Sequence, residues 1–215
     1  MRMRKKKHGA ERINACSEFL IQNTTINTDN VNEIYGCDTA RPLWLEIGCG
    51  KGAFVSKLAE RNPEVNLIAL ERIADVAMLA MERCKAAELP NVRFIIGDMA
   101  KLWDIFEDHT VDRIYLNFSD PWPKAGHAKR RLTHRNFLAE YRRILKPGGA
   151  IFFKTDNRDL FDFSVEEFRD CGFRLENLTY DLHGSEWAKD NIMTEYEKNF
   201  SEKGFSINRV EAFTE

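Results

Sequence analysis

The chain has 215 residues, of which 43% are hydrophobic, and its 32 Lys and Arg nearly balance 34 Asp and Glu, for a formal net charge of -2. This length suits one α/β domain with a substantial core and excludes a second full domain. No apolar run is long enough to span a membrane, so we expect a cytoplasmic protein that does not bind membranes. The five cysteines are scattered and include no Cys-x-x-Cys pair, which predicts reduced thiols and no zinc site.

The basic residues are concentrated in two segments. The first ten residues contain five Lys or Arg and no acid, and residues 121–149 contain eight Lys or Arg and one acid. A basic run is often only a solvated surface, but two such runs on an acidic body also suit a polyanionic partner. We interpret residues 1–40 as a basic N-terminal arm with a covering segment, and residues 41–215 as the main domain.

Hydrophobic periodicity and the Gly and Pro positions predict alternating strands and helices after residue 40. The expected strands are residues 43–47, 66–70, 92–96, 111–118, 150–154, 173–182 and 206–213. The expected helices are residues 53–60, 74–88, 133–145 and 160–171, with a further helix that ends at Gly204. This alternation is typical of an α/β fold with a mostly parallel sheet.

A glycine turn follows the first expected strand, within the sequence Leu-Trp-Leu-Glu-Ile-Gly-Cys-Gly-Lys-Gly of residues 43–52. Gly48 and Gly50 leave the backbone free to approach a ligand, and the next helix directs its positive end at the turn. The spacing also satisfies a relaxed dinucleotide fingerprint. Glu46 argues against a pyrophosphate there and favours a ligand with a cationic amino-acid group, such as S-adenosylmethionine.

Two further strands are expected to end in acids. Glu71 follows residues 66–70 and suits the hydroxyls of a ribose, although it can instead pair with Arg72 or serve as an acid at the start of a helix. Asp98 follows residues 92–96 and suits the exocyclic amine of adenine, although it can instead cap a helix. Because the carboxyl ends of parallel strands meet at one edge of a sheet, we expect Glu46, Glu71 and Asp98 to line one crevice.

The fourth expected strand is followed by Asp-Pro-Trp-Pro-Lys at residues 120–124. The two prolines fix φ on both sides of Trp122 and make a stiff turn that holds Asp120 and Lys124. Trp122 can stack on a base or plug the core, and the sequence leaves both alternatives open. The basic residues that come next lie beside the expected crevice, which favours phosphate binding. His127 and His134 lack acidic or Cys partners at ligand spacing, so we expect no metal.

Two motifs lie in the C-terminal third of the chain. The expected strand 150–154 leads into Thr-Asp-Asn, where Asp156 or Asn157 is either a site residue or the N-cap of the next helix. Thr194-x-x-Glu197 forms a ready capping box for a helix. A functional interpretation of this second motif depends on the substrate.

These motifs together resemble those of the bacterial tRNA (guanine-N7-)-methyltransferases, over about the whole chain after residue 40. The motifs are Glu46-x-Gly48-x-Gly50, Asp120-Pro-Trp-Pro-Lys124, Lys129-Arg130-Arg131, Lys154-Thr155-Asp156-Asn157 and Thr194-Glu195-Tyr196-Glu197. The resemblance implies a Rossmann-like class I fold, with a seven-stranded, mostly parallel sheet, an antiparallel last strand and helices on both faces. It also implies S-adenosylmethionine as methyl donor and a variable-loop guanine of tRNA, guanine-46, as acceptor.

The resemblance assigns roles to the matching residues. It implies that Asp120 is catalytic and that the cofactor is bound by Glu46, Gly48, Gly50, Glu71, Asp98 and Asp120. It implies substrate binding by Lys124, Asp156, Thr194, Glu195, Tyr196 and Glu197. It implies RNA binding by Gly126, His127, Ala128, Lys129, Arg130 and Arg131. Whether the protein is a monomer or a homodimer stays open.

The chemistry of this reaction agrees with the residues present. Guanine N7 has a free lone pair, so methylation requires no proton removal and no nucleophile triad. The reaction does require in-line alignment and negative charge near a purine that becomes cationic, which Asp120 can supply. The Watson–Crick edge of guanine offers two parallel N–H donors to a carboxylate such as Glu197 or Asp156.

Three alternatives remain. A small-molecule methyltransferase of the same fold would leave the basic segment without a purpose. An RNA-binding protein that senses nucleotides without chemistry is disfavoured by the acids at four strand ends, and an NAD dehydrogenase is disfavoured by Glu46. The sequence therefore predicts a tRNA methyltransferase.

Overall fold

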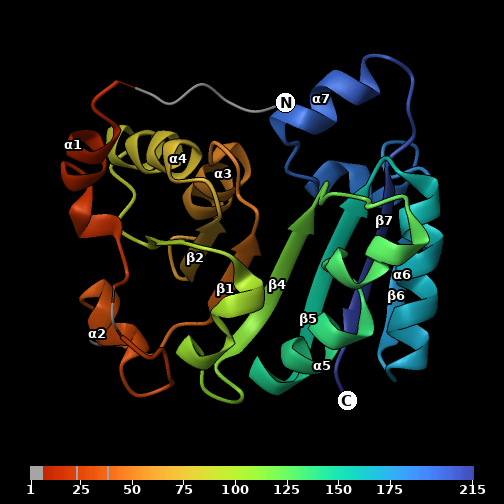
Figure 1. The fold of residues 1–215 in the computed structure, drawn as a ribbon, viewed down its shortest axis with the longest axis horizontal. Coiled ribbons are helices and arrows are strands. Elements are labelled where there is room, and N and C mark those ends of the chain that lie inside the picture. Colours follow the sequence, from red (N-terminus) through yellow and green to blue (C-terminus); the bar gives the residue numbers. More distant parts are fainter. Residues whose placement is uncertain (1–6, 23, 38) are drawn as a thin grey trace. The chain divides into compact units, whose positions relative to one another are not determined.

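The computed structural model describes residues 7–22, 24–37 and 39–215 of the chain. Residues 1–6, which hold most of the expected basic arm, lie outside the described residues. The chain divides into two compact units, Met1–Phe106 and Glu107–Glu215, and Figure 1 shows the elements of each.

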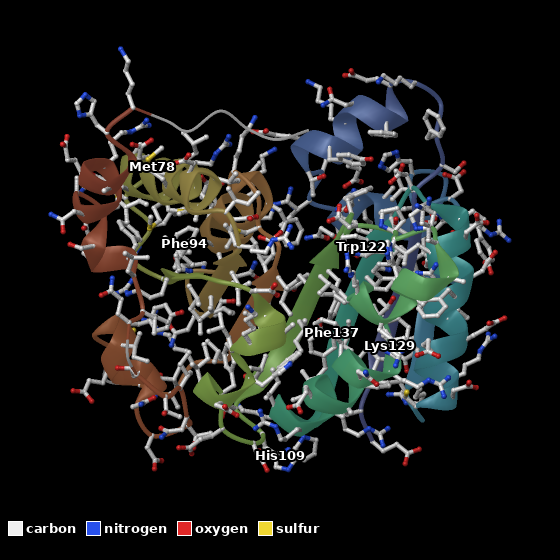
Figure 2. All side chains as sticks on the ribbon, viewed as in Figure 1. Met78, Phe94, His109, Trp122, Lys129 and Phe137 are labelled. Atoms are coloured by element: carbon white, nitrogen blue, oxygen red, sulfur yellow. The ribbon has the colours of Figure 1, made fainter. Side chains whose placement is uncertain are left out.

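The first unit is built on three parallel strands in the order β3-β2-β1. The elements are β1 (Leu43–Ile47), α3 (Ala53–Arg61), β2 (Asn66–Glu71), α4 (Ala74–Ala86) and β3 (Val92–Ile96), followed by the 3₁₀ turns η2 (Met99–Lys101) and η3 (Trp103–Ile105). All five residues of β1 are buried, as expected for a strand covered on both faces. Met78 of α4 and Phe94 of β3 are fully buried within this unit (Figure 2). The three strands match their expected bounds to within one residue.

The N-terminal segment packs onto this first unit. Its elements are α1 (Gly9–Asn14), the 3₁₀ turn η1 (Ser17–Phe19) and α2 (Val31–Tyr35). Arg12 of α1 donates from Nε and Nη2 to the two carboxylate oxygens of Glu82 in α4, at 2.7 and 2.6 Å. The hydroxyl of Tyr35 donates to the carbonyl of Leu67 in β2 at 2.6 Å. These bonds attach the segment to a helix and to a strand of the unit.

The second unit is built on four strands in the order β4-β5-β7-β6. The strands are β4 (Val111–Asn117), β5 (Leu145–Thr155), β6 (Arg174–Thr179) and β7 (Asn208–Phe213), and the helices are η4 (Ala125–Arg130), α5 (Arg135–Ile144), α6 (Arg158–Asp170), η5 (Glu186–Asp190) and α7 (Glu195–Ser201). β4 and β5 are parallel, and β7 is antiparallel to both of its neighbours. Figure 1 shows α7 beyond the arrowheads of β4 and β5.

The described residues contain seven strands of a mixed sheet, in the order β3-β2-β1 in the first unit and β4-β5-β7-β6 in the second. Its last strand in sequence, β7, is the antiparallel one. This confirms the expected α/β class and the expected antiparallel last strand.

The start of β5 differs from the prediction, which placed a turn at residues 146–149 and a strand only after it. Leu145 already pairs with Val111, and Ala150 pairs with Arg113, so four residues of β5 face a single residue of β4. Gly148 adopts a φ of +73° in this irregular stretch. Such a bulge absorbs a Pro-Gly-Gly sequence without ending the strand pairing.

Gly52 supports the close packing of α3 against α4. Its φ is +77°, and a Cβ at this position would lie 2.8 Å from Cβ and 3.0 Å from Cα of Ala80. Gly36, in the same unit, has a φ of +64° but no atom within 4 Å of a Cβ. A comparison of alanine substitutions at Gly52 and Gly36 therefore distinguishes the cost of backbone strain from the cost of a packing clash.

We expect Gly52→Ala to destabilise the protein by about 2 kcal/mol more than Gly36→Ala, because overpacking adds roughly 1–3 kcal/mol to the strain of a positive φ. Urea unfolding of the two variants and the parent measures the difference. Equal losses in the two variants would show that α3 and α4 yield freely at this contact.

Candidate active site

The glycine turn after β1 has an open face. Gly48 and Gly50 have φ angles of +83° and +56°, and a Cβ at either position would meet no atom within 4 Å. The backbone is nevertheless held, because Gly48 N donates to Leu70 O at 2.8 Å and Gly50 N donates to Glu71 Oε2 at 3.1 Å. The turn is thus fixed to the end of β2, with room for a ligand where side chains are missing.

The three predicted acids lie at the carboxyl ends of neighbouring parallel strands. Glu46 is the penultimate residue of β1 and only 2% exposed. Glu71 ends β2, and its Oε1 accepts from Ile73 N at 2.8 Å. Asp98 follows β3, and its Oδ1 accepts from Ala100 N at 3.2 Å. The capping alternative for Asp98 is therefore confirmed, for a 3₁₀ turn.

The carboxylates at this edge of the sheet affect the pKa of the Cys49 thiol. Burial raises its pKa well above the ordinary value, and the negative charges of Glu46 and Glu71 raise it further. The thiol therefore stays protonated and is unsuited to nucleophilic attack. Two carboxylates that act on one buried atom also make this edge attractive to a cationic ligand.

The Pro-Trp-Pro turn follows β4 in the second unit. Phe118 begins it with a φ of +53°, and its N donates to the carbonyl of Lys154 in β5 at 2.9 Å. Asp120 and Lys124, on either side of the turn, are both exposed. Trp122 is half-buried, and its ring contacts the guanidinium of Arg130 at 4.9 Å and the His127 ring at 5.7 Å. Figure 2 labels Trp122 and Lys129, which belong to the chain segment that connects β4 to α5.

Most of the basic residues in segment 121–149 have partners inside the second unit. The pairs are Arg131 with the Pro121 and Trp122 carbonyls, Arg135 with Glu167, Arg142 with the Gly172 carbonyl, Arg143 with Asp108 and Glu140, and Lys146 with Asp112. Lys124, Lys129 and Arg130 are exposed. The basic count of the sequence therefore overstated the charge that this segment offers to a partner.

Asp156 follows the carboxyl end of β5, and its charge acts on the hydroxyl of Tyr196 in α7. Asn157, and not Asp156, caps α6, since Asn157 Oδ1 accepts from Leu160 N at 2.8 Å. Burial raises the pKa of Asp156. Burial, and then the charge of Asp156, raise the pKa of the Tyr196 hydroxyl. The cap question is thus resolved in favour of Asn157, which leaves the Asp156 carboxylate for a site.

Phe118, Tyr196 and Phe200 form an aromatic surface in the second unit. The Tyr196 ring is stacked on Phe200 with centroids 4.2 Å apart, and it lies 5.1 Å from the Phe118 ring. Tyr196 remains 45% exposed. Sequence reasoning missed Phe118 and Phe200, although the i, i+4 spacing of two aromatic residues on an expected helix was a usable signal.

Glu197 is fully buried, and both of its carboxylate oxygens are engaged. Oε2 pairs with Lys154 Nζ at 2.6 Å, and Oε1 accepts from Asn191 Nδ2 at 2.6 Å and lies 2.9 Å from His183 Nε2. Thr194 and Glu197 also form the expected capping box of α7. The capping interpretation is therefore confirmed, while His183 and Asn191 were missed because they lie in irregular segments without a motif.

The charge of Glu197 is favoured by this environment. Burial raises the pKa of the carboxyl, but ion pairing with Lys154 and the hydrogen bonds of Lys154, His183 and Asn191 outweigh burial, and the pKa lies below its ordinary value. Glu197 is thus an ionised anchor that connects β5 to α7.

The described residues contain no group of three or more His, Cys, Asp and Glu placed to hold a metal ion. Over the same part of the chain, no helix combines the length and the apolar character needed to cross a membrane.

Comparison with known proteins gives consistent relatives. A family model described as "Putative methyltransferase" matches residues 40–210. The tRNA (guanine-N(7)-)-methyltransferase of Brevibacillus brevis is 48% identical over 192 residues, 89% of each chain, and that of Streptococcus sanguinis is 44% identical over 212 residues, 99% of each chain.

Solved structures with the same fold are also methyltransferases. An antibiotic-related methyltransferase has a TM-score of 0.62 at 18% identity and covers 89% of this chain and 95% of its own. A 30S ribosomal A1408 methyltransferase from an uncultured bacterium has a TM-score of 0.60 at 14% identity and covers 98% of this chain and 95% of its own. At these identities the likeness establishes the fold alone.

We expect Glu197→Gln to destabilise the protein by about 3 kcal/mol at pH 7, because it leaves Lys154 buried without its counter-charge. The folded-state pKa of Glu197 lies below its ordinary value of 4.5, so this contribution is present above pH 4.5 and is lost as the pH falls further. Urea unfolding from pH 7 down to pH 3 should therefore show the gap to wild type closing.

The matched control is Glu202→Gln at the end of α7, where the carboxylate is exposed and 4.0 Å from Lys198. Exposed pairs contribute at most about 1 kcal/mol. A loss in Glu197→Gln no larger than in this control would contradict the anchoring role.

Proposed function

Because the chain belongs to the family of tRNA (guanine-N(7)-)-methyltransferases, we propose that it transfers a methyl group from S-adenosylmethionine to N7 of guanine-46 in the variable loop of tRNA. The observation that carries the proposal is 44% identity over 99% of both chains to a relative of that name. Membership also confirms the resemblance and the enzyme class expected from the motifs. The protein would act in the cytoplasm, where its substrate is found.

The edge of the first unit fits this methyl donor. S-adenosylmethionine supplies a methyl group on a cationic sulfonium, next to an amino-acid ammonium. Glu46 provides a buried negative charge for these cations, and Gly48 and Gly50 leave room beside the backbone. Glu71 keeps lone pairs for ribose hydroxyls while it holds the turn, and Asp98 suits the adenine amine.

The second unit supplies the groups for the acceptor. Guanine N7 accepts a methyl group without losing a proton, so the purine becomes cationic. We assign to Asp120 the stabilisation of that charge and to Lys124 a contact with the nucleotide. Asp156 is the better candidate to accept the two N–H donors of the Watson–Crick edge, because the oxygens of Glu197 are already bonded.

The residues of the Thr194–Glu197 motif have two different roles: some stabilise α7, and another is placed to contact the substrate. Thr194 and Glu197 cap α7, and Glu197 holds the helix on Lys154. Tyr196 presents an exposed ring beside Asp156, which suits stacking on the guanine. Glu195 lies on the exposed side of the same helix turn.

The decisive experiment is transfer of labelled methyl from S-adenosylmethionine to unmodified tRNA. We expect wild type to methylate one guanine per tRNA, and replacement of guanine-46 by adenine to abolish transfer. Asp120→Asn should lower kcat about 100-fold, since an electrostatic group of this kind is worth about 10² to 10³ in rate. Glu166→Gln, an exposed acid on α6, serves as the control and should leave kcat unchanged.

Two outcomes would overturn this assignment. No transfer to any tRNA by wild type that still binds the donor would favour the small-molecule alternative. Full activity of Asp120→Asn would remove Asp120 from the reaction.

The exposed basic residues of segment 121–149 predict salt-dependent tRNA binding. Each phosphate contact contributes about 0.7 to 0.9 to the slope of log K against log salt. Lys129→Ala should lower this slope by the contribution of about one contact, with kcat unchanged at saturating tRNA. Lys57→Ala, which changes an exposed residue of α3, should leave the slope unchanged. Filter binding between 50 and 300 mM salt measures the slope, and an identical slope for Lys129→Ala would exclude a phosphate contact.

A further inference from the structure

Arg131 makes its contacts inside the protein. Its guanidinium donates from Nε to the Pro121 carbonyl at 3.0 Å and from Nη2 to the Trp122 carbonyl at 3.2 Å. The same guanidinium lies 4.3 Å from the centroid of the Phe163 ring in α6. The side chain thus links the Pro-Trp-Pro turn to a helix of the unit.

The turn that Arg131 contacts needs such support. Pro121 and Pro123 have no N–H to donate, so the turn has fewer backbone bonds available than a typical loop. Trp122 has a φ of +41°, a left-handed conformation that a bulky residue adopts only under constraint. An arginine fork that donates to two consecutive carbonyls supplies this constraint from outside the turn.

The backbone around Arg131 fixes its direction. Arg131 N donates to Ala128 O at 3.0 Å, and His134 N donates to Arg131 O at 3.0 Å. The residue therefore lies between two local hydrogen bonds just before α5. Stacking on Phe163 orients the plane of the guanidinium, and Phe163 belongs to a helix of thirteen residues. The fork is thereby preorganised for the two carbonyls.

We propose that Arg131 is a positioning residue for methyl transfer: it holds the Pro121–Trp122 backbone, and through it Asp120 and Lys124, in the reactive arrangement, and it is not a phosphate ligand. The proposal rests on the proposed function, since it concerns the residues assigned to the acceptor. It separates Arg131 from its neighbours Lys129 and Arg130, which are exposed.

The test compares Arg131→Lys, Arg131→Ala and Lys129→Ala. Lysine keeps the positive charge but loses the fork and most of the stacking, so charge and geometry are separated. We expect both Arg131 variants to lower kcat by about 10- to 100-fold at saturating tRNA, because small misplacements of reacting groups cost rates of this order. The tRNA dissociation constant and its salt slope should stay at the wild-type values.

Lys129→Ala should differ from the Arg131 variants in its binding: loss of a phosphate contact lowers the salt slope and raises the tRNA dissociation constant. The proposal is overturned if Arg131→Ala lowers the salt slope as Lys129→Ala does while kcat is retained. It is also overturned if Arg131→Lys has wild-type kcat.

A second measurement monitors the conformation of the Pro-Trp-Pro turn independently of enzymatic activity. Near-ultraviolet circular dichroism of wild type and Arg131→Lys, each compared with its Trp122→Phe counterpart, isolates the signal of Trp122. We expect this signal to weaken in Arg131→Lys and to persist in Lys129→Ala. An unchanged signal overturns the proposal even if wild type proves inactive on tRNA, an outcome that would count against the proposed function.

Phe163→Leu covers the case in which the Arg131 variants fail to fold. It removes the stacking surface and leaves the fork and its charge, so we expect a smaller fall in kcat, about 3- to 10-fold, with an unchanged salt slope. Wild-type kcat in a folded Phe163→Leu would overturn the role of the stacked guanidinium.

Discussion

The buried ion pair between Lys154 and Glu197 is the interaction that holds α7, and with it the residues that we propose for the methyl acceptor. It joins the carboxyl end of β5 to the first turn of α7, and Lys154 also donates to the carbonyl of Ile192, which precedes the helix, at 2.8 Å. A helix of seven residues is too short to persist alone, so its place is set by this pair and by the capping box. The exposed ring of Tyr196 is thereby held by charges that do not themselves face a ligand.

The strands were largely predictable because their local signals agree with the tertiary structure. The buried strands of the first unit read as continuous apolar runs, and Gly and Pro mark their ends. The start of β5 was not predictable, because Pro147 and Gly148 signal a turn while pairing with β4 continues across a bulge. The local sequence does not show whether pairing with a neighbouring strand continues past extra residues.

The part of the candidate site that lies at the ends of the parallel strands was predictable, because ligand-binding residues are expected at those positions. Glu46 and Glu71 follow from the rule that ligands lie at the carboxyl ends of parallel strands. The engagement of Glu197 by His183 and Asn191 was not predictable, because those contacts join segments that no sequence period relates. For the same reason, the capping box alone could not show that both carboxylate oxygens of Glu197 are bonded.

The basic segment 121–149, which includes the Pro-Trp-Pro turn, combines two kinds of basic residue that a count of charges does not distinguish. Its arginines mostly bind partners within the second unit: Arg131 binds carbonyls, Arg135 binds Glu167 and Arg142 binds the Gly172 carbonyl. A planar fork suits such fixed acceptors, whereas the compact charge of a lysine such as Lys129 suits a mobile phosphate. Under the proposed function, rigidity of the turn and attraction of the tRNA therefore come from neighbouring residues of the same charge, and the geometry of each side chain determines which of the two it provides.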